Sequence, residues 1–152
     1  MGLLNYTTSI DVTKTLGEIQ GMLARAGASR ITLDYSGQVP AAIEFEIATA
    51  IGVQAFRLPV NLQAIRSTLV NQHNRGVRGV TARHTTQEHA ARVAWRIIKD
   101  WLEVQVALIE TGMVKLEQVM LPYLLVPATG QTMFEAFEQH NLALMAPRSE
   151  GR

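Results

Sequence analysis

One uninterrupted stretch, residues 85–111, has the apolar periodicity of a long amphipathic helix. Its sequence is TTQEHAARVAWRIIKDWLEVQVALIET, with no proline or glycine before Gly112. Thr85 or Thr86 is suited to cap its start, and Gly112 to end it in a left-handed conformation. The side chains expected to face a core recur at steps of three and four: Ala91, Ala94, Ile98, Trp101, Leu102, Gln105, Leu108 and Ile109. Because such a helix is stable mainly through its packed face, the rest of the chain is expected to pack around it.

A second stripe on the same helix is cationic. His89, Arg92, Arg96 and Lys99 follow one another at steps of three, four and three residues. The stripe is compatible with an anion-binding face. It is equally compatible with an ordinary solvated face on which Lys99 and Glu103 form an i,i+4 ion pair.

Charge is unevenly distributed along the 152 residues, although the formal net charge is only +1. Residues 61–100 contain seven lysines and arginines against two acidic residues. The segments before and after them are net acidic. Positive charge gathered in the middle of a balanced chain predicts a local anion-binding surface.

Composition excludes several classes of site. The chain has no cysteine, which excludes disulfides and thiolate metal sites and is typical of a reducing cytoplasm. No secretion signal is recognised at the start, MGLLNYTTSID, and no apolar run approaches a membrane span. No GxSxG elbow, phosphate-binding P-loop or metal-ligand spacing occurs. We therefore expect no enzyme, no cofactor, no metal and no membrane association, and a cytoplasmic location.

The remaining elements predict an α+β fold, in which a three-stranded antiparallel meander packs against the long helix. Residues 11–26 are predicted to form a helix with Leu16, Ile19, Leu23 and Ala26 inward. Alternating apolar residues predict strands at 30–36 (Ile31, Leu33, Tyr35), 42–48 (Ile43, Phe45, Ile47) and 54–60 (Phe56, Leu58, Val60). Asn61 is suited to cap a short helix at 62–72, and further short helices are expected at 115–120 and 132–144. Residues 1–146 are predicted to form one domain and residues 147–152 a disordered tail.

Two local features have competing interpretations. Gly17 and Gly21, four apart on the first helix, either are merely tolerated or let another backbone approach closely. Glu44 and Glu46 share the wet face of the second strand, where ion pairs with Arg57 or Arg30 are a better explanation than a catalytic pair.

The main candidate site combines a basic loop with the cationic stripe. The loop, HNRGVRGVTARH at residues 73–84, contains little that could enter a core, and we predict that it is mobile. Its arginines would reach phosphates, while the helix supplies fixed spacing and a favourable dipole at its start. The candidate nucleic-acid-binding residues are Arg75, Arg78, Arg83, His89, Arg92, Trp95, Arg96 and Lys99.

The aromatic and imidazole side chains are less specific. Trp101 is expected in the core. Trp95 lies at the border of the two faces, where it either packs under the sheet or stacks on an unpaired base, which would favour single strands. His84 and His89 are five residues apart and miss the spacing of a helical metal-ligand pair.

Several stretches resemble a family of small proteins from bacteriophages, prophages and related mobile elements. They are AARVAWRIIKDWLEVQVALIETGMV followed by LEQVMLPYLL, together with YTTSIDVTKTLGEIQGMLARAGA and FRLPVN. The resemblance covers roughly residues 5–125. It implies a phage or prophage protein acting inside a bacterial cell and carries over no catalytic residue. Where the family pattern has a capping serine or threonine before LEQVMLPY, this chain has Lys115.

The expected order of elements is also similar to the β-β-β-α core of phage single-strand annealing proteins. That similarity implies rings or filaments holding DNA beside the long helix, although the acidic outer sheet face fits it poorly. We therefore expect a homo-oligomeric protein that binds single-stranded DNA in replication or recombination. The alternatives are an interaction module that blocks a host protein through the apolar clusters at 113–123 and 133–137, and an oligomeric sponge for an anionic nucleotide.

Overall fold

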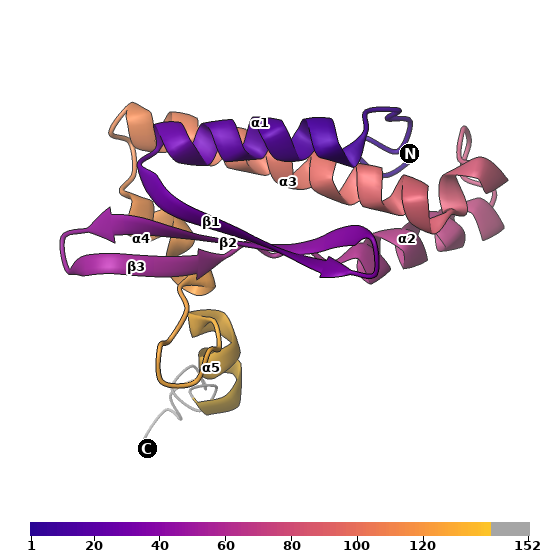
Figure 1. The fold of residues 1–152 in the computed structure, drawn as a ribbon. Helices are drawn as coiled ribbons and strands as arrows, with labels where there is room; N and C mark the ends of the chain where they lie inside the picture. The colour runs from indigo at the N-terminus through magenta and orange to yellow at the C-terminus, as the bar shows by residue number, and fades with distance from the viewer. Residues whose placement is uncertain (141–152) are drawn as a thin grey trace, which may run out of the picture.

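A computed structural model describes residues 1–140 (Figure 1). Its elements are α1 (Val12–Arg25), β1 (Ala28–Ser36), β2 (Val39–Thr49), β3 (Gly52–Arg57), α2 (Leu62–Asn74), the 3₁₀ helix η1 (Ala82–Thr85), α3 (Gln87–Glu110), α4 (Leu116–Met120), the 3₁₀ helix η2 (Leu121–Tyr123) and α5 (Met133–His140). The fold is the predicted α+β class. The expected tail at 147–152 and the end of the expected helix at 132–144 lie outside the described residues.

The sheet is an antiparallel meander in the order β1-β2-β3, as predicted. Its centre is the cross-strand pair Phe45 and Phe56, whose rings stack with centroids 5.3 Å apart. Ile43 and Ile47 flank Phe45 on the same buried face of β2. Strict alternation therefore identified the core face of the two strands correctly.

The core does not extend to the end of β1. Ile31 and Leu33 pack against the core, but Tyr35 is 59% exposed. Tyr35 lines an open pocket together with Leu33 and with Leu16 of α1, so it lies on the side of the sheet that alternation predicts. The prediction that Tyr35 is buried is wrong, because the pocket leaves this side chain open to solvent.

The outer face of the sheet carries the expected ion pairs. Arg57 Nη2 lies 2.6 Å from Glu44 Oε1, and Arg30 Nε lies 3.8 Å from Glu46 Oε2. Both pairs join adjacent strands, and the short one engages Glu44 firmly, whereas the long, exposed contact of Glu46 with Arg30 is weak. This arrangement leaves no paired carboxylates free for acid–base chemistry on this face.

Helices α1 and α3 lie side by side over one face of the sheet (Figure 1). Thr86 caps α3 by accepting a hydrogen bond from His89 N–H at 3.1 Å, and Gly112, at φ +74°, follows its end, both as predicted. The side chains that fill the space between α1, α3 and the sheet include Leu16, Ile19, Leu23, Trp95, Ile98 and Leu102. Within residues 1–140, no helix combines the length and apolar character that a membrane crossing requires.

The buried face of α3 is wider than its predicted stripe. Ala91, Ala94, Ile98 and Leu102 are buried as expected, whereas the other predicted core positions are half-buried: Trp101, Gln105, Leu108 and Ile109. The first half of the helix instead buries a second side, because α2 packs there. Leu69 of α2 forms a separate small cluster with Ala90 and Val93. Asn61 begins α2 by accepting a hydrogen bond from Ala64 N–H at 3.0 Å, which confirms the predicted cap.

The segment after α3 returns to the free edge of the sheet. Leu125 N–H donates to Ala55 O at 2.8 Å, and Leu124 forms an isolated bridge with Phe56. Met120 is buried in the main core, while Met113, Leu121 and Phe134 are exposed. Part of this apolar segment therefore covers β3, and part remains on the surface.

The glycines of α1 are in open surroundings. An added Cβ would meet nothing within 4 Å at Gly17, and only the Arg25 guanidinium at 3.9 Å at Gly21. Neither position admits a close backbone approach, so the interpretation of mere tolerance holds.

Replacing Gly17 or Gly21 with alanine is expected to raise the free energy of unfolding by about 0.5–1 kcal/mol each, because glycine is entropically costly inside a helix. Urea unfolding measures the change. Gly27→Ala serves as the opposite control, since Gly27 has φ +102° and a side chain there is strained. Loss of stability in Gly17→Ala or Gly21→Ala would mean that an unseen partner packs on these positions.

Candidate nucleic-acid interface

The basic loop is an anchored connection between α2 and α3. Gly76 and Gly79 take positive φ values of +71° and +88°, which lets the chain reverse twice. Val80 is buried, and η1 follows it. The loop was expected to contribute little to a core, and this expectation needs correction at two of its side chains, Val80 and His84, which reach the interior.

The loop arginines are the cations of the predicted set that stay free. Arg75, Arg78 and Arg83 are exposed, and none forms an ion pair within residues 1–140. Arg66 of α2 lies near the same loop, and its Nε–H donates a hydrogen bond to Thr85 O at 3.1 Å. From residue 61 to residue 92 the sequence holds five arginines and one carboxylate, Glu88. This end of the fold, on the right in Figure 1, therefore carries a local excess of positive charge.

The helical stripe is largely neutralised by carboxylates. Arg96 Nη1 lies 2.6 Å from Glu18 Oε2 of α1, and the Arg96 side chain is only 14% exposed. Lys99 Nζ lies 2.7 Å from Glu103 Oε2, which is the i,i+4 pair of the alternative interpretation. The prediction that Arg96 and Lys99 bind nucleic acid conflicts with this placement, because α1 packs along the stripe and supplies Glu18.

Arg92 forms only a weak ion pair. Its Nε lies 3.9 Å from Asp11 Oδ1, and the Asp11 side chain is 82% exposed. An exposed pair at this distance contributes little, so an anionic ligand can replace the carboxylate. Arg92 is the one stripe residue that the fold leaves available next to the loop.

Trp95 and His89 are core residues. Trp95 is 0% exposed, and its Nε1–H donates to Pro40 O of β2 at 2.9 Å. His89 is 8% exposed, and its Nε2 is hydrogen-bonded to Tyr6 O. Stacking of Trp95 on a base is therefore wrong for this fold. The packing alternative is the one that the structure supports, because the sheet covers Trp95 and the N-terminal segment covers His89.

A polar pocket of about 410 Å³ lies at the start of α3. It is lined by four hydroxyl side chains, two imidazoles and two guanidinium groups: Thr7, Thr8, Ser9, Thr86, His84, His89, Arg83 and Arg92. No carboxylate is among these lining residues. Arg83, His89 and Arg92 belong to the set of binding residues predicted from the sequence, whereas the hydroxyl side chains and His84 do not. No local signal marks these residues, since residues 7–9 meet the helix only through contacts between distant parts of the chain.

His84 is the buried imidazole of this pocket. Its Nδ1 accepts a hydrogen bond from Thr81 N–H at 3.0 Å, and its ring meets that of Tyr6 edge-on with centroids 5.3 Å apart. Burial, followed by the neighbouring His89 and Arg83, lowers the pKa of His84 below its usual value. The ring is therefore neutral near pH 7, with its proton on Nε2.

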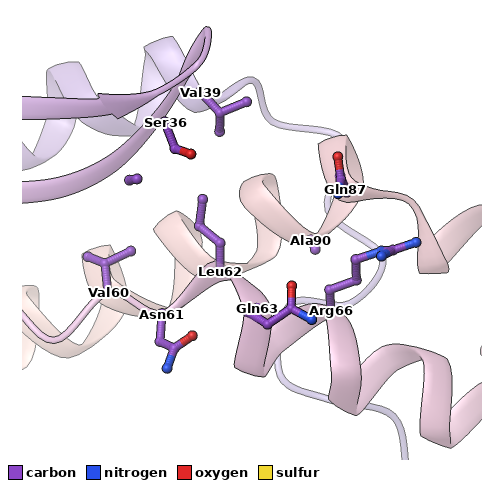
Figure 2. Close-up of a pocket in the computed structure, with 10 residues that line it drawn as sticks. Ser36, Val39, Val60, Asn61, Leu62, Gln63, Arg66, Gln87 and Ala90 are labelled. Atoms are coloured by element: carbon purple, nitrogen blue, oxygen red, sulfur yellow. The ribbon is translucent and has the colours of Figure 1, made fainter.

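A second pocket, of about 380 Å³, lies between the β1–β2 hairpin and the starts of α2 and α3 (Figure 2). Ser36 and Val39 line it from the hairpin, and Leu62, Arg66 and Ala90 line it from the helices. It holds one cation, Arg66, among apolar and amide side chains. This pocket is less suited to a multiply charged anion than the one at the start of α3.

The two histidines do not complete a metal centre. The His84 and His89 rings are 5.0 Å apart, nearer than their spacing in sequence suggested. Within residues 1–140, no three side chains of the metal-binding types His, Asp and Glu gather around one point.

Comparisons with protein-family models, curated proteins and solved structures found no match to this chain.

Proposed function

We propose that the protein is a non-enzymatic nucleic-acid-binding protein whose contact surface is the loop between α2 and α3. The observation that supports this is the contrast between two sets of cations. Arg96 and Lys99 are paired with carboxylates, whereas Arg75, Arg78 and Arg83 are exposed without an ion pair in the described part of the chain. Unpaired arginines favour phosphate, because their fork of N–H donors matches its oxygens.

The proposed ligand is single-stranded DNA, and the proposed setting is replication or recombination of phage DNA in a bacterial cell. Support comes from the resemblance of residues 5–125 to phage and prophage proteins, and from the order of three strands followed by a long helix. The same similarity favours a homo-oligomer. Because Trp95 is in the core, it cannot stack on bases and cannot explain a preference for single strands. The test therefore includes both single-stranded and duplex DNA.

The test is an anisotropy titration of labelled single-stranded and duplex oligonucleotides over a series of salt concentrations. The variant Arg75→Ala/Arg78→Ala/Arg83→Ala is expected to bind single strands at least roughly tenfold more weakly at low salt. It should also lower the slope of log affinity against log salt by about two, because three phosphate contacts no longer release counterions.

The matched control removes three cations elsewhere. Arg25, Arg30 and Lys115 are exposed and lie in or beside α1, β1 and α4, toward the other end of the molecule. Replacing all three with alanine lowers the net charge by the same amount as the loop variant. This control is expected to keep most of the affinity for single-stranded DNA. Equal losses in both triple variants, or no binding by the unmodified protein at low salt, would refute the proposed function.

A second candidate is interaction with a host protein through exposed apolar side chains. Met113, Leu121, Met133 and Phe134 are exposed on the segment from the end of α3 to α5. These residues are absent from the basic loop, so the two functions are separable. If the protein acts only on a protein partner, the triple arginine variant keeps that activity and the unmodified protein binds no oligonucleotide.

A further inference from the structure

We propose that the pocket at the start of α3 is a binding site for a phosphomonoester, either free or at the end of a nucleic-acid strand. The pocket is assembled from the N-terminal segment, η1 and the first turns of α3. It shares Arg83 with the proposed DNA-binding loop, but a small phosphate compound can occupy it whether or not the loop binds DNA.

The charge of the lining specifies an anion. Arg83 has no ion pair within residues 1–140, and Arg92 has only the long contact with exposed Asp11. No carboxylate lines the pocket, and Thr86, one of its lining residues, caps the 24-residue helix α3. Two guanidinium groups beside a helix start favour a doubly charged phosphate over a singly charged carboxylate.

His84 supplies an observation independent of the helix start. The side chain is 2% exposed, and Nδ1 is occupied by Thr81 N–H, so Nε2 carries the proton. Nε2–H has no hydrogen-bond partner within residues 1–140. Every fully buried side-chain nitrogen of these residues does have a partner. Nε2 is therefore not fully enclosed, and His84 is a lining residue of the pocket, so a ligand bound there can accept from this donor. A buried donor held in this position is matched to a ligand oxygen.

The hydroxyl side of the pocket is held in place by contacts from distant parts of the chain. Tyr6 O is hydrogen-bonded to His89 of α3, and Asn5 Nδ2 donates to Asp100 Oδ2 at 2.7 Å. Leu3 N–H donates to Gln72 Oε1 of α2 at 3.0 Å. These bonds attach the N-terminal segment to α2 and α3 just before Thr7, Thr8 and Ser9, which line the pocket, so the donors are arranged before a ligand arrives. A volume of about 410 Å³ is ample for a phosphate group and part of what it is attached to.

The experiment titrates the full chain with inorganic phosphate, adenosine 5′-monophosphate and adenosine, followed by calorimetry and thermal shift. Phosphate and the monophosphate are expected to bind and to raise the melting temperature with concentration, whereas adenosine is not. His84→Asn keeps an oxygen acceptor near Nδ1 for Thr81 N–H but removes the Nε2 donor. It should weaken phosphate binding roughly tenfold, the usual effect of losing one hydrogen bond to a charged group.

Arg83→Ala provides a second variant at an exposed position, so the test stands even if His84→Asn fails to fold. Arg25→Ala is the control, because Arg25 is exposed at the far end of α1 and does not line the pocket, so phosphate affinity should be unchanged. Oligonucleotides with and without a 5′-phosphate separate the two sources. If the protein prefers the 5′-phosphorylated oligonucleotide and His84→Asn abolishes that preference, the site binds strand ends. If only the mononucleotide binds, the site is for a free nucleotide.

The proposal is overturned if neither phosphate nor the monophosphate binds at millimolar concentration, or if Arg25→Ala weakens binding as much as Arg83→Ala. Either result leaves the proposed nucleic-acid binding intact, because that is measured on the loop variants. Conversely, phosphate binding with no affinity for oligonucleotides would refute the proposed function and retain the pocket.

Discussion

Trp95→Ala is expected to lower the free energy of unfolding by about 3–5 kcal/mol, the range for deleting a large aromatic side chain from a core. Trp95 is the largest fully buried side chain of residues 1–140, and it lies between α3 and the sheet. The substitution also leaves Pro40 O without the indole N–H that it accepts at 2.9 Å. Urea unfolding measures the change. The expected loss is a large fraction of the total free energy of unfolding, which is small in most domains.

Trp101→Ala is the matched control for this prediction. Trp101 is only half-buried and packs edge-on against Tyr123 with ring centroids 5.5 Å apart. Its removal is expected to cost less than that of Trp95. If Trp95→Ala instead folded with normal stability and lost affinity for single strands, Trp95 would be a stacking residue and its placement in the core would be wrong.

Leu69→Ala is expected to lower the free energy of unfolding by about 2–5 kcal/mol, because the cavity it leaves can collapse only in part. Leu69 is 0% exposed and joins α2 to Ala90 and Val93 of α3. Since α2 leads directly into the loop that carries Arg75, Arg78 and Arg83, weaker docking should also lower oligonucleotide affinity. The neighbouring Thr68 is exposed, and Thr68→Ala is expected to change stability by less than about 0.5 kcal/mol.

Amide hydrogen exchange locates the effect of Leu69→Ala. Protection should fall most in α2 and in the first half of α3, and least in the strands around Phe45 and Phe56. A uniform loss of protection, or a loss confined to the sheet, would show that the small cluster is not what holds α2 in place.

The sequence predicted the local structure of this protein well, because local structure depends on near neighbours in the chain. The caps at Asn61 and Thr86, the end of α3 at Gly112 and the core face of β2 each follow from a few consecutive residues. Tyr35 is the exception, because alternation indicates the side of a strand on which a residue lies but not whether another element covers it.

The candidate site was predicted only in part. The basic loop was correctly identified as cationic, and Arg75, Arg78 and Arg83 are exposed and form no ion pair with any other residue of 1–140. The stripe was read from the periodicity of one helix, which says nothing about what lies opposite it. Glu18, 78 residues from Arg96, neutralises that stripe once α1 packs beside α3.

What the sequence alone determined, then, is which segments are helix or strand and where positive charge collects, since both follow from short-range geometry and composition. Tertiary packing decided which charges stay free, that Trp95 is core, and that residues 7–9 meet His84 and Arg83 in one pocket. Those outcomes depend on contacts between residues far apart in the chain, such as the 83 positions between Tyr6 and His89. No periodicity within one segment encodes such contacts, because they form only when separately folded faces bury their apolar surface against each other.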